Sequence, residues 1–456
     1  MSQALAMLLR VILRIFFRRV EVSGAELVPN TGPILFVLNH QNGLVDPIIL
    51  IGFAPRRSVF LAKEPLFHMP VVGLLVKALG SIPIYRRADG VTDITQNKGT
   101  FKHVWAALER GQAIAIFPEG TSHSDPELKP FKTGAARIAL GAIGVTAQGR
   151  AVQIVPAGLY YTAKTTFRSS ALLYFGPPIV VEPRPVDENG EPSPEAIAEL
   201  TAAVERALGD VTLQADRREA LALVTRAERI FSSPAADAGT SGERDLVAQF
   251  EMRQRFVARY AELRTHAPER IEEIDRLVTR HEAKLTAAGI SPSTLMPAQI
   301  DAMRVVRYTV KTLATVLIAL PVALVGLAIN YPAYWFVGPL ATRVVKPEVD
   351  VIATQKIVAG GMLFPVTWVL VGWLAGRWLG VWWGVTAAVA APFAGWVALR
   401  FLERLDHFVG ETRGFLLLLF RPKTSLRLVA EGREIRHAIL ALDHATVVPQ
   451  EPGHTG

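Results

Sequence analysis

The chain of 456 residues contains no cysteine and comparatively few charged residues. Without cysteine it forms no disulfide, uses no thiolate nucleophile and holds no Cys-ligated zinc or iron–sulfur centre. Charged residues make up 20% of the chain, against about 25% in an ordinary soluble domain, whereas hydrophobic residues make up 50%. This composition excludes a disordered or fibrous protein.

The charges that are present do not balance. The 49 Lys and Arg residues outnumber the 41 Asp and Glu residues, which gives a net charge of +8. An excess of positive charge favours an anionic partner, such as nucleic acid, a phospholipid headgroup or a phosphorylated metabolite. Nucleic acid is not expected, because the basic residues flank apolar segments and form no recognition motif.

Three long apolar segments occupy the second half of the chain. Residues 312–329 and 357–376 contain no charged side chain, and residues 381–399 follow after a short turn. A bilayer core needs about 20 apolar residues per helix, so we predict a membrane region at 304–400 with two to three hydrophobic segments. Basic residues flank this region on both sides, which predicts that both flanks are cytoplasmic and that one segment is re-entrant or interfacial.

Residues 1–20 are predicted to form an amphipathic interfacial helix. Arg10, Arg14 and Arg18 share one face at four-residue spacing, and apolar side chains occupy the rest. Such a helix lies in a membrane interface with its guanidinium groups among anionic headgroups. The alternative is an amphipathic helix that caps a soluble core.

Between residues 21 and 210, short apolar runs alternate with helical stretches. We expect strands at residues 34–38, 58–61, 81–85, 113–117 and 152–159. Helical stretches between them, such as 99–109 and 134–142, predict an α/β domain with a largely parallel sheet. Ligands of such sheets bind at the carboxyl ends of strands, so the residues after each run are the candidates for a site.

The remaining segments are predicted to be helical. Residues 211–303 are rich in Arg, Glu, Ala and Leu with helical periodicity and are expected to form a helical arm. Residues 401–456 are expected to form a basic helical C-terminal tail. The chain is therefore predicted to be an α/β domain followed by a helical arm and a C-terminal transmembrane α-helical region.

Polar residues follow the first predicted strand: Asn39, His40 and, six positions after His40, Asp46. A carboxylate beside a histidine fixes the imidazole tautomer and supports its charge as it accepts a proton. No nucleophilic third partner is needed if the substrate supplies a hydroxyl. Asp46 and Pro47 also match an N-cap followed by proline at the first helical position, and both interpretations can hold together.

Later strand ends carry further candidates. Arg86 follows the third predicted strand and has the forked, permanently charged geometry suited to a phosphate, although Arg86 and Arg87 taken alone would more often be surface charges. After the fourth strand, Glu119 can hold an arginine or a substrate hydroxyl, and Gly120 permits a sharp turn that exposes backbone N–H groups. Val155 and Pro156 interrupt an apolar strand, which predicts a bend that lines a cavity.

These blocks follow one another in a particular order: residues 40–46 (HQNGLVD), 80–86 (GSIPIYR), 117–120 (FPEG) and 155–158 (VPAG). Over residues 20–210 the series resembles the glycerolipid acyltransferase superfamily, which includes lysophosphatidate and glycerol-3-phosphate acyltransferases. The common motif of that family has four residues between His and Asp, whereas five separate His40 from Asp46. The chain is similar in this respect to longer glycerol-3-phosphate/dihydroxyacetone-phosphate acyltransferases with C-terminal membrane segments, which carry five.

The resemblance implies a membrane-bound O-acyltransferase of phospholipid synthesis. Such an enzyme moves a fatty acyl group from acyl-CoA or acyl-carrier protein to a hydroxyl of glycerol-3-phosphate or dihydroxyacetone phosphate. It implies that His40 is the general base and that Asp46 orients it, with no acyl-enzyme, no cofactor and no metal. The substrate-binding residues that it implies are Asn39, Arg86, Glu119, Gly120 and Thr121.

Other functions remain open at this point. One is a 1-acylglycerol-3-phosphate (lysophosphatidate) acyltransferase that makes phosphatidate, and another is a non-catalytic lipid-binding scaffold on an acyltransferase fold. A metal-dependent phosphohydrolase would use His40, Asp46, His103 and His123 as ligands, but no H-x-x-x-H or H-E-x-x-H spacing supports it. We expect an integral protein of the cytoplasmic membrane, with its catalytic domain in the cytoplasm against anionic phospholipid.

Overall fold

The computed structural model describes residues 3–86, 97–125, 127–143, 151–185, 192–215, 218–231, 245–290, 292, 302–343 and 351–444. The chain divides into two compact units. The first comprises Met1–Gln214 and Ala341–Ile357, and the second comprises Ala215–Leu340 and Val358–Gly456. The part of the predicted C-terminal tail at residues 445–456 lies outside the described residues.

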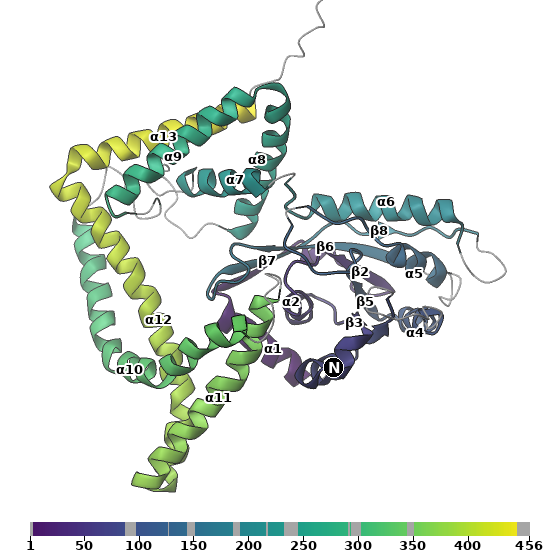
Figure 1. Cartoon of the computed structure of the whole chain (residues 1–456), viewed down its shortest axis with the longest axis horizontal. Helices are drawn as coiled ribbons and strands as arrows, with labels where there is room; N and C mark the ends of the chain where they lie inside the picture. Colours follow the sequence, from purple (N-terminus) through teal and green to yellow (C-terminus); the bar gives the residue numbers. More distant parts are fainter. Residues whose placement is uncertain are drawn as a thin grey trace, which may run out of the picture. The chain divides into compact units, whose positions relative to one another are not determined.

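The first unit is built on an eight-stranded sheet (Figure 1). Its strands are β1 (Arg19–Ser23), β2 (Ile34–Leu38), β3 (Ser58–Lys63), β4 (Ile82–Ile84), β5 (Ala113–Ile116), β6 (Gln153–Tyr161), β7 (Ser170–Phe175) and β8 (Ile179–Val180). They lie in the order β1-β7-β6-β2-β5-β3-β4, with β8 paired to β6. Neighbours from β6 to β4 are parallel, whereas β7 and β8 run antiparallel to β6. The predicted largely parallel sheet is confirmed.

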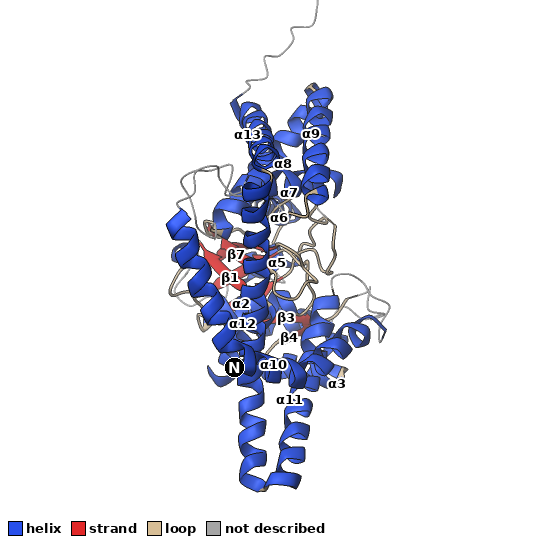
Figure 2. Cartoon of the chain, turned by 90° about the vertical axis from the view of Figure 1, so that its left-hand side faces the viewer, coloured by secondary structure: helices blue, strands red, loops and turns tan. Residues whose placement is uncertain are grey.

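Helices cover both faces of this sheet, and strands and helices are distinguished by colour in Figure 2. They are α1 (Gln3–Phe16), α2 (Val45–Phe53), α3 (Pro70–Ala78), α4 (Asn97–Glu109), α5 (Gly134–Ile143) and α6 (Pro194–Asp210), with short 3-10 turns η1 (Ala25–Leu27) and η2 (Glu64–His68). Phe36 of β2 packs in one core cluster with α1 and α2, and Leu35 packs in the other with α4, α5 and α6. Because successive side chains point to opposite faces, all of β2 is buried, which explains its unbroken apolar run.

The arginines of the N-terminal helix have a role that the sequence pattern did not predict. Arg18 lies beyond the end of α1, so only Arg10 and Arg14 remain on the helix. Nε of Arg10 donates to the carbonyl of Gly52 at 2.7 Å, and both guanidinium groups lie over the ring of Phe53. Arg10 therefore satisfies one carbonyl at the carboxyl end of α2, where carbonyl groups lack helical partners, and Arg14 packs on the same end of the helix.

A separate row of apolar side chains is exposed on α1. The row consists of Met7, Leu8, Val11 and Ile15. The opposite side of the helix, including Leu9 and Leu13, is buried in the core of the domain. An exposed apolar row on a surface helix is typical of a contact with a membrane or a partner.

Strand β6 leaves no room for a side chain at Gly158. A Cβ atom there would lie 1.6 Å from the carbonyl oxygen of Val211, just after α6. We expect Gly158→Ala to destabilise the protein by about 3 kcal/mol or more, because backbone on both sides must move. Gly99→Ala in α4 is the matched control, since nothing lies within 4 Å of its Cβ. It should stabilise the protein by about 0.5–1 kcal/mol, and equal unfolding temperatures for the two variants would contradict the expectation.

In its described part the second unit is helical. The helices of the rest of the chain are α7 (Arg218–Phe231), α8 (Leu246–His266), α9 (Pro268–Ala287), α10 (Ala302–Arg343), α11 (Ile352–Leu379), α12 (Val381–Phe420) and α13 (Pro422–His444). Among the described residues, three stretches are long and apolar enough to cross a membrane: Val310–Ala341, Ile352–Leu379 and Val381–Gly410. These stretches indicate membrane association.

Asn330 ties these three apolar helices together. Its Nδ2 donates to the carbonyl groups of Gly326 in α10 and Ala391 in α12, and its Oδ1 accepts from Nε1 of Trp368 in α11. In an apolar environment a polar group needs a protein partner. Asn330 is therefore a structural link between the helices.

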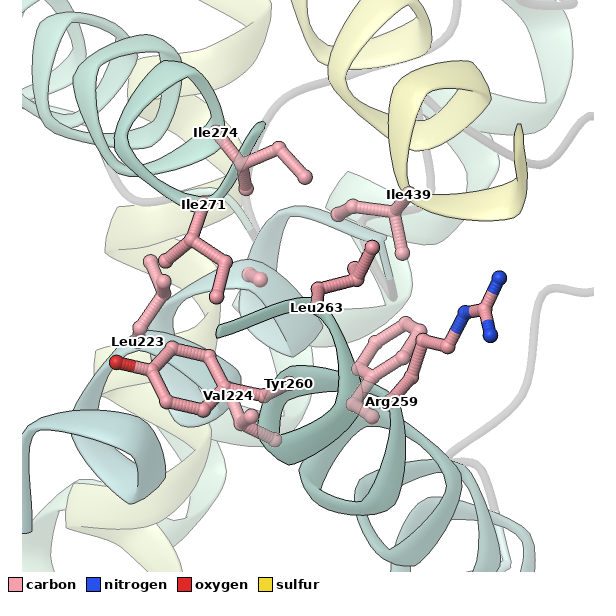
Figure 3. Close-up of a pocket in the computed structure, with 10 residues that line it drawn as sticks. Leu223, Val224, Arg259, Tyr260, Leu263, Ile271, Ile274 and Ile439 are labelled. Carbon is pink, nitrogen blue, oxygen red and sulfur yellow. The ribbon is translucent and has the colours of Figure 1, made fainter. Parts of the chain in front are cut away.

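The helices α7, α8, α9 and α13 enclose a small apolar cavity (Figure 3). Its volume is about 50 Å³, and its lining includes Leu223, Ile274 and Ile439. A space of this size holds a few water molecules but not a fatty acyl chain.

Candidate active site

The candidate residues meet at one edge of the sheet. Strands β2, β5, β3 and β4 are mutually parallel, so their carboxyl ends lie along the same edge. The segments after β2, β4 and β5 carry His40, Arg86 and Glu119. The structure connects all three segments through hydrogen bonds, as expected for ligand sites in open α/β sheets.

His40 and Asp46 form a hydrogen-bonded pair. Nδ1 of His40 lies 2.9 Å from Oδ2 of Asp46, and the same oxygen accepts the N–H groups of Gln41 at 2.8 Å and Asn42 at 2.7 Å. Asp46 is fully buried, and an oxygen that accepts two backbone N–H groups is typical of an ionised carboxylate, which has no hydrogen to donate. Nδ1 therefore carries the hydrogen, and Nε2 keeps a lone pair that can accept a proton. With 18% of its side chain exposed, His40 is reachable by a substrate.

The start of α2 closes the five-residue loop between the two residues. The predicted N-cap at Asp46 is wrong, because the helix begins at Val45 and Leu44 takes the N-cap position. Asp46 lies in the first turn, where the positive end of the helix dipole favours a carboxylate. Its side chain turns back onto the loop, which Gly43 helps to form with a positive φ of 43°.

Phe117 holds the plane of the imidazole. The ring centroids of His40 and Phe117 are 3.9 Å apart with an interplanar angle of 13°, so the two rings are stacked. Phe117 is stacked in turn with Phe60 of β3, at 5.7 Å. Stacking and the bond to Asp46 together fix the direction in which Nε2 points.

Tyr161 completes the surroundings of the carboxylate, and the sequence patterns did not indicate it. This last residue of β6 donates its O–H to Oδ1 of Asp46 at 2.5 Å. Burial, followed by the charge of Asp46 and the hydrogen bond, raises the pKa of Tyr161 well above 10. The phenol is therefore a hydrogen-bond donor throughout the physiological pH range. The predicted strand ended at Leu159, and extending it by two residues would have brought Tyr161 to the edge that carries the site.

Tyr161→Phe should change the stability of the protein at alkaline pH. The raised pKa means that the folded state holds the phenolic proton more tightly than the unfolded state, where the pKa of tyrosine is about 10. This contribution to stability is complete below pH 10 and is lost as the pH rises above that value. We expect the free energy of unfolding to fall more steeply with pH in the wild type than in Tyr161→Phe. Parallel curves from alkaline chemical denaturation would contradict this role.

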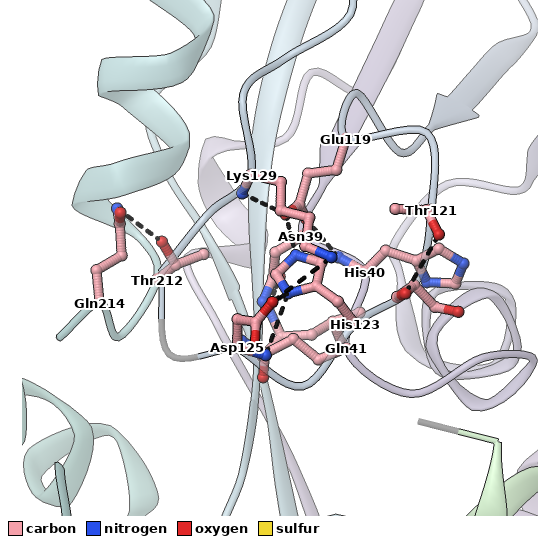
Figure 4. Close-up of polar contacts among 12 residues, drawn as sticks. Asn39, His40, Gln41, Glu119, Thr121, His123, Asp125, Lys129, Thr212 and Gln214 are labelled. Carbon is pink, nitrogen blue, oxygen red and sulfur yellow. Dashed lines mark hydrogen bonds and ion pairs between the residues drawn. The ribbon is translucent and has the colours of Figure 1, made fainter. Parts of the chain in front are cut away.

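Glu119 holds the backbone of His40 (Figure 4). Its Oε1 accepts the N–H of His40 at 3.0 Å, while Oε2 accepts the N–H of Lys129 at 2.9 Å and pairs with Nε2 of His123. The N–H of His123 donates to the carbonyl of His40 at 3.0 Å. Glu119 was predicted to bind substrate, but it is 2% exposed and both of its oxygens have protein partners. In this structure Glu119 and His123 position His40.

Asn39 also serves as a structural link. It is fully buried, its Nδ2 donates to the carbonyl of Leu159 at 3.0 Å, and its Oδ1 accepts the N–H of Leu159 at 2.7 Å. These two bonds join the end of β2 to β6. The predicted contact of Asn39 with substrate therefore conflicts with its burial, because neither end of its amide faces solvent.

The other predicted substrate-binding residues lie together. Nη1 of Arg86 donates to the carbonyl of Gly120. Gly120 has a φ of 73°, which the turn after β5 requires. Thr121 is exposed, and its hydroxyl donates to the carbonyl of Ser122 at 3.3 Å. The structure thus brings the Arg86 and Gly120 segments into direct contact at the edge that carries His40.

Val155 and Pro156 are both buried within strand β6 of the sheet, and their part in lining a cavity stays a prediction. Val155 is fully buried in a core cluster. Pro156 lies where β6 changes partner, between Ile154, which pairs with β8, and Ala157, which pairs with β7. Its carbonyl accepts the N–H of Gly176 at 2.9 Å. The gap in the pairing on this side accommodates a residue that has no N–H to donate, and β6 continues through Pro156, which is paired with Val37 of β2 on the other side.

The metal-site alternative finds no support in the side-chain geometry. Among the residues that the structure describes, no three His, Asp or Glu side chains are grouped closely enough to hold a metal ion. His103, one of the four proposed ligands, is exposed on α4. Nε2 of His123 is instead paired with Oε2 of Glu119.

Comparisons with known proteins give a consistent picture. Residues 19–160 match the family model Acyltransferase. The glycerol-3-phosphate O-acyltransferases 2 and 1 of Saccharomyces cerevisiae are 27% and 24% identical over 79% and 78% of this chain, and over 63% and 58% of their own lengths. The chloroplastic 1-acyl-sn-glycerol-3-phosphate acyltransferase BAT2 of Brassica napus is 31% identical over 27% of this chain and 34% of its own length. The chain thus spans less than two thirds of the yeast relatives that it matches.

The matched residues contain the His40–Asp46 pair, Arg86 and Glu119, and they coincide with most of the parallel sheet. Residues 19–160 accordingly form a domain of the Acyltransferase family. The relatives that match the chain are named as acyltransferases of glycerol-3-phosphate and 1-acyl-sn-glycerol-3-phosphate, so this domain fits the glycerolipid acyltransferases.

Proposed function

We propose that the protein transfers a fatty acyl group from a thioester donor to a hydroxyl of glycerol-3-phosphate or dihydroxyacetone phosphate. The observation that carries the proposal is the His40–Asp46 pair, which leaves Nε2 of a partly exposed imidazole with a lone pair beside the segments of Arg86 and Gly120. Relatives named as glycerol-3-phosphate acyltransferases match 79% and 78% of the chain, whereas BAT2 matches 27%. This difference favours glycerol-3-phosphate over lysophosphatidate as the acceptor.

In the proposed reaction, Nε2 of His40 removes the proton from the acceptor hydroxyl. The hydroxyl oxygen attacks the carbonyl carbon of the thioester, the new C–O bond forms, the C–S bond breaks, and the thiolate leaves. Protonated His40 returns the proton to this thiolate. Asp46 stabilises the imidazolium while it exists. The substrate hydroxyl is the nucleophile, so a chain without cysteine can carry out the reaction.

Arg86 is the proposed ligand of the acceptor phosphate. A guanidinium group binds phosphate through paired N–H donors, and Gly120 and the exposed Thr121 lie on the segment that Arg86 contacts. We expect acyl-CoA or acyl-carrier protein as the donor. Neither the acceptor site nor the reaction requires a metal or cofactor.

The proposed setting is an anionic membrane surface. The product is a lipid whose acyl chain must enter a bilayer, and the exposed row on α1 and the three apolar stretches both favour contact with one. Basic residues concentrate in α13 after the last apolar stretch. Since positive residues favour the cytoplasmic side, we expect the cytoplasmic membrane, with the catalytic domain in the cytoplasm.

The proposal is tested by assaying the purified full-length chain in bilayer nanodiscs. Labelled acyl-CoA and acyl-carrier protein are each supplied with glycerol-3-phosphate, dihydroxyacetone phosphate or lysophosphatidate in parallel. Acylation of glycerol-3-phosphate is the expected result. Acylation of lysophosphatidate alone would identify a lysophosphatidate acyltransferase, and no acylation of any acceptor would favour the non-catalytic lipid-binding scaffold.

A further inference from the structure

The first turn of α11 packs on the loop that joins His40 to Asp46. Ala353 is fully buried in the core cluster that contains α1 and α2. Oγ1 of Thr354 accepts the N–H of Leu44 at 3.1 Å. Nζ of Lys356 donates to the carbonyl of Thr165 at 2.7 Å. Three of four consecutive residues of this helix therefore contact the acyltransferase domain, and all of these contacts lie within the first unit.

The bond from Leu44 matters because of where Leu44 lies. Leu44 takes the N-cap position of α2, two positions before Asp46, and N–H groups at the start of a helix lack partners within the helix. The bond to Thr354 supplies a partner from a residue 310 positions away in the sequence. It therefore restrains the point at which the loop becomes the helix that carries Asp46.

The hydrogen bond from Lys356 to Thr165 restrains the backbone on the other side of the Asp46 carboxylate. Thr165 belongs to the connection between β6 and β7, directly beside Lys164, whose carbonyl accepts Nδ2 of Asn42 at 3.3 Å. Asn42 in turn donates its backbone N–H to Asp46. The first turn of α11 thus reaches both backbone segments that surround Asp46.

The same helix continues as an apolar stretch. After Lys356, residues 357–376 contain no charged side chain, and Ile352–Leu379 is long and apolar enough to cross a membrane. With a rise of 1.5 Å per residue, Thr354 lies about 4.5 Å along the axis from the first residue of the uncharged run. The loop of His40 and Asp46 is therefore tied to the very beginning of a candidate membrane helix.

We propose that Thr354 is a positioning residue for the His40–Asp46 pair, through which α11 holds the catalytic loop in its active geometry at the membrane surface. The inference rests on the proposed acyl transfer, in which His40 must reach the acceptor hydroxyl. Small displacements of a catalytic group are costly, since a shift of about 1 Å can reduce the rate 100-fold. Thr354 touches no reacting atom and acts only by restraining Leu44.

Thr354→Val tests the proposal, because valine keeps the shape of threonine but cannot accept the hydrogen bond. We expect kcat to fall between about 10-fold and 100-fold with the KM of both substrates nearly unchanged. Thr354→Ser should restore kcat because it retains the hydroxyl. Exchange of the Leu44 amide with deuterium should be faster in Thr354→Val than in the wild type or Thr354→Ser.

Thr367→Val provides a matched control on the same helix. The hydroxyl of Thr367 donates to the carbonyl of Leu363 within α11 itself, so this variant should retain wild-type kcat. Wild-type kcat in Thr354→Val, or an equal loss in Thr367→Val, would overturn the positioning role. An inactive wild type with every donor and acceptor would instead overturn the proposed function, so the two failures are distinguishable.

Discussion

His40→Ala is expected to reduce kcat by about 100-fold to 10,000-fold while the protein remains folded. The imidazole accepts the proton of the attacking hydroxyl, and no other described side chain holds a comparable position at the end of β2. In the His40→Ala variant the Asp46 carboxylate still accepts hydrogen bonds from two backbone N–H groups and from Tyr161. The loop therefore keeps most of its hydrogen bonds. Turnover of labelled acyl donor by the purified protein measures the effect.

His68→Ala is the matched control for this prediction. Its imidazole is largely exposed and pairs only with Glu64 on η2 among the contacts that the structure gives, so its loss should leave turnover unchanged. Far-UV circular dichroism and the unfolding temperature verify that both variants are folded. Wild-type turnover in His40→Ala would exclude His40 as the general base.

Asp46→Asn should be nearly as damaging, with a loss in kcat of roughly 100-fold or more. The buried carboxylate accepts four hydrogen bonds, three on Oδ2 and one on Oδ1. An amide has only one acceptor oxygen and carries no charge, so it orients the imidazole less well and does not stabilise the imidazolium. KM for the acceptor should change little, because Asp46 is fully buried and cannot contact the substrate.

A matched control for this variant is Asp275→Asn. Asp275 lies half-exposed on α9 and pairs with Arg226 at 3.0 Å, so the same chemical change there should leave kcat unaltered. Retention of most of the activity by Asp46→Asn would mean that His40 works without its carboxylate partner.

Much of the fold follows from local patterns. Strands β2, β5 and β6 bury both faces, and β3 and β4 are partly buried. All five appear as short apolar runs, so their positions could be predicted to within two residues. Strand β7 was not predicted, although it also carries an apolar run, SALLYF. Strands β1 and β8 have no such run, and residues 19–23 directly follow the arginine-rich helix α1. Their extended form depends on pairing, as in β1 with β7.

Some features of the candidate site could likewise be predicted from the sequence, and others could not. The proximity of His40 and Asp46 could be predicted, because six positions along the chain limit how far apart the two can lie. The sequence could not distinguish a residue that binds substrate from one that supports the pair. Asn39 and Glu119 have side chains suited to either role, and only their burial and their backbone partners assign them to support.

By itself, the sequence determined that the protein has a parallel α/β domain, a His–Asp pair at a strand end and apolar stretches long enough to cross a membrane. Each of these depends on residues close together in the chain. The tertiary structure alone decided which distant residues complete the site: Glu119 lies 79 positions from His40, Tyr161 lies 115 from Asp46, and Thr354 lies 310 from Leu44. The physical reason is the strand order, which sets β5 and β6 on either side of β2, and the packing of α11 on the domain. No local pattern specifies such contacts, because they exist only once the sheet has assembled.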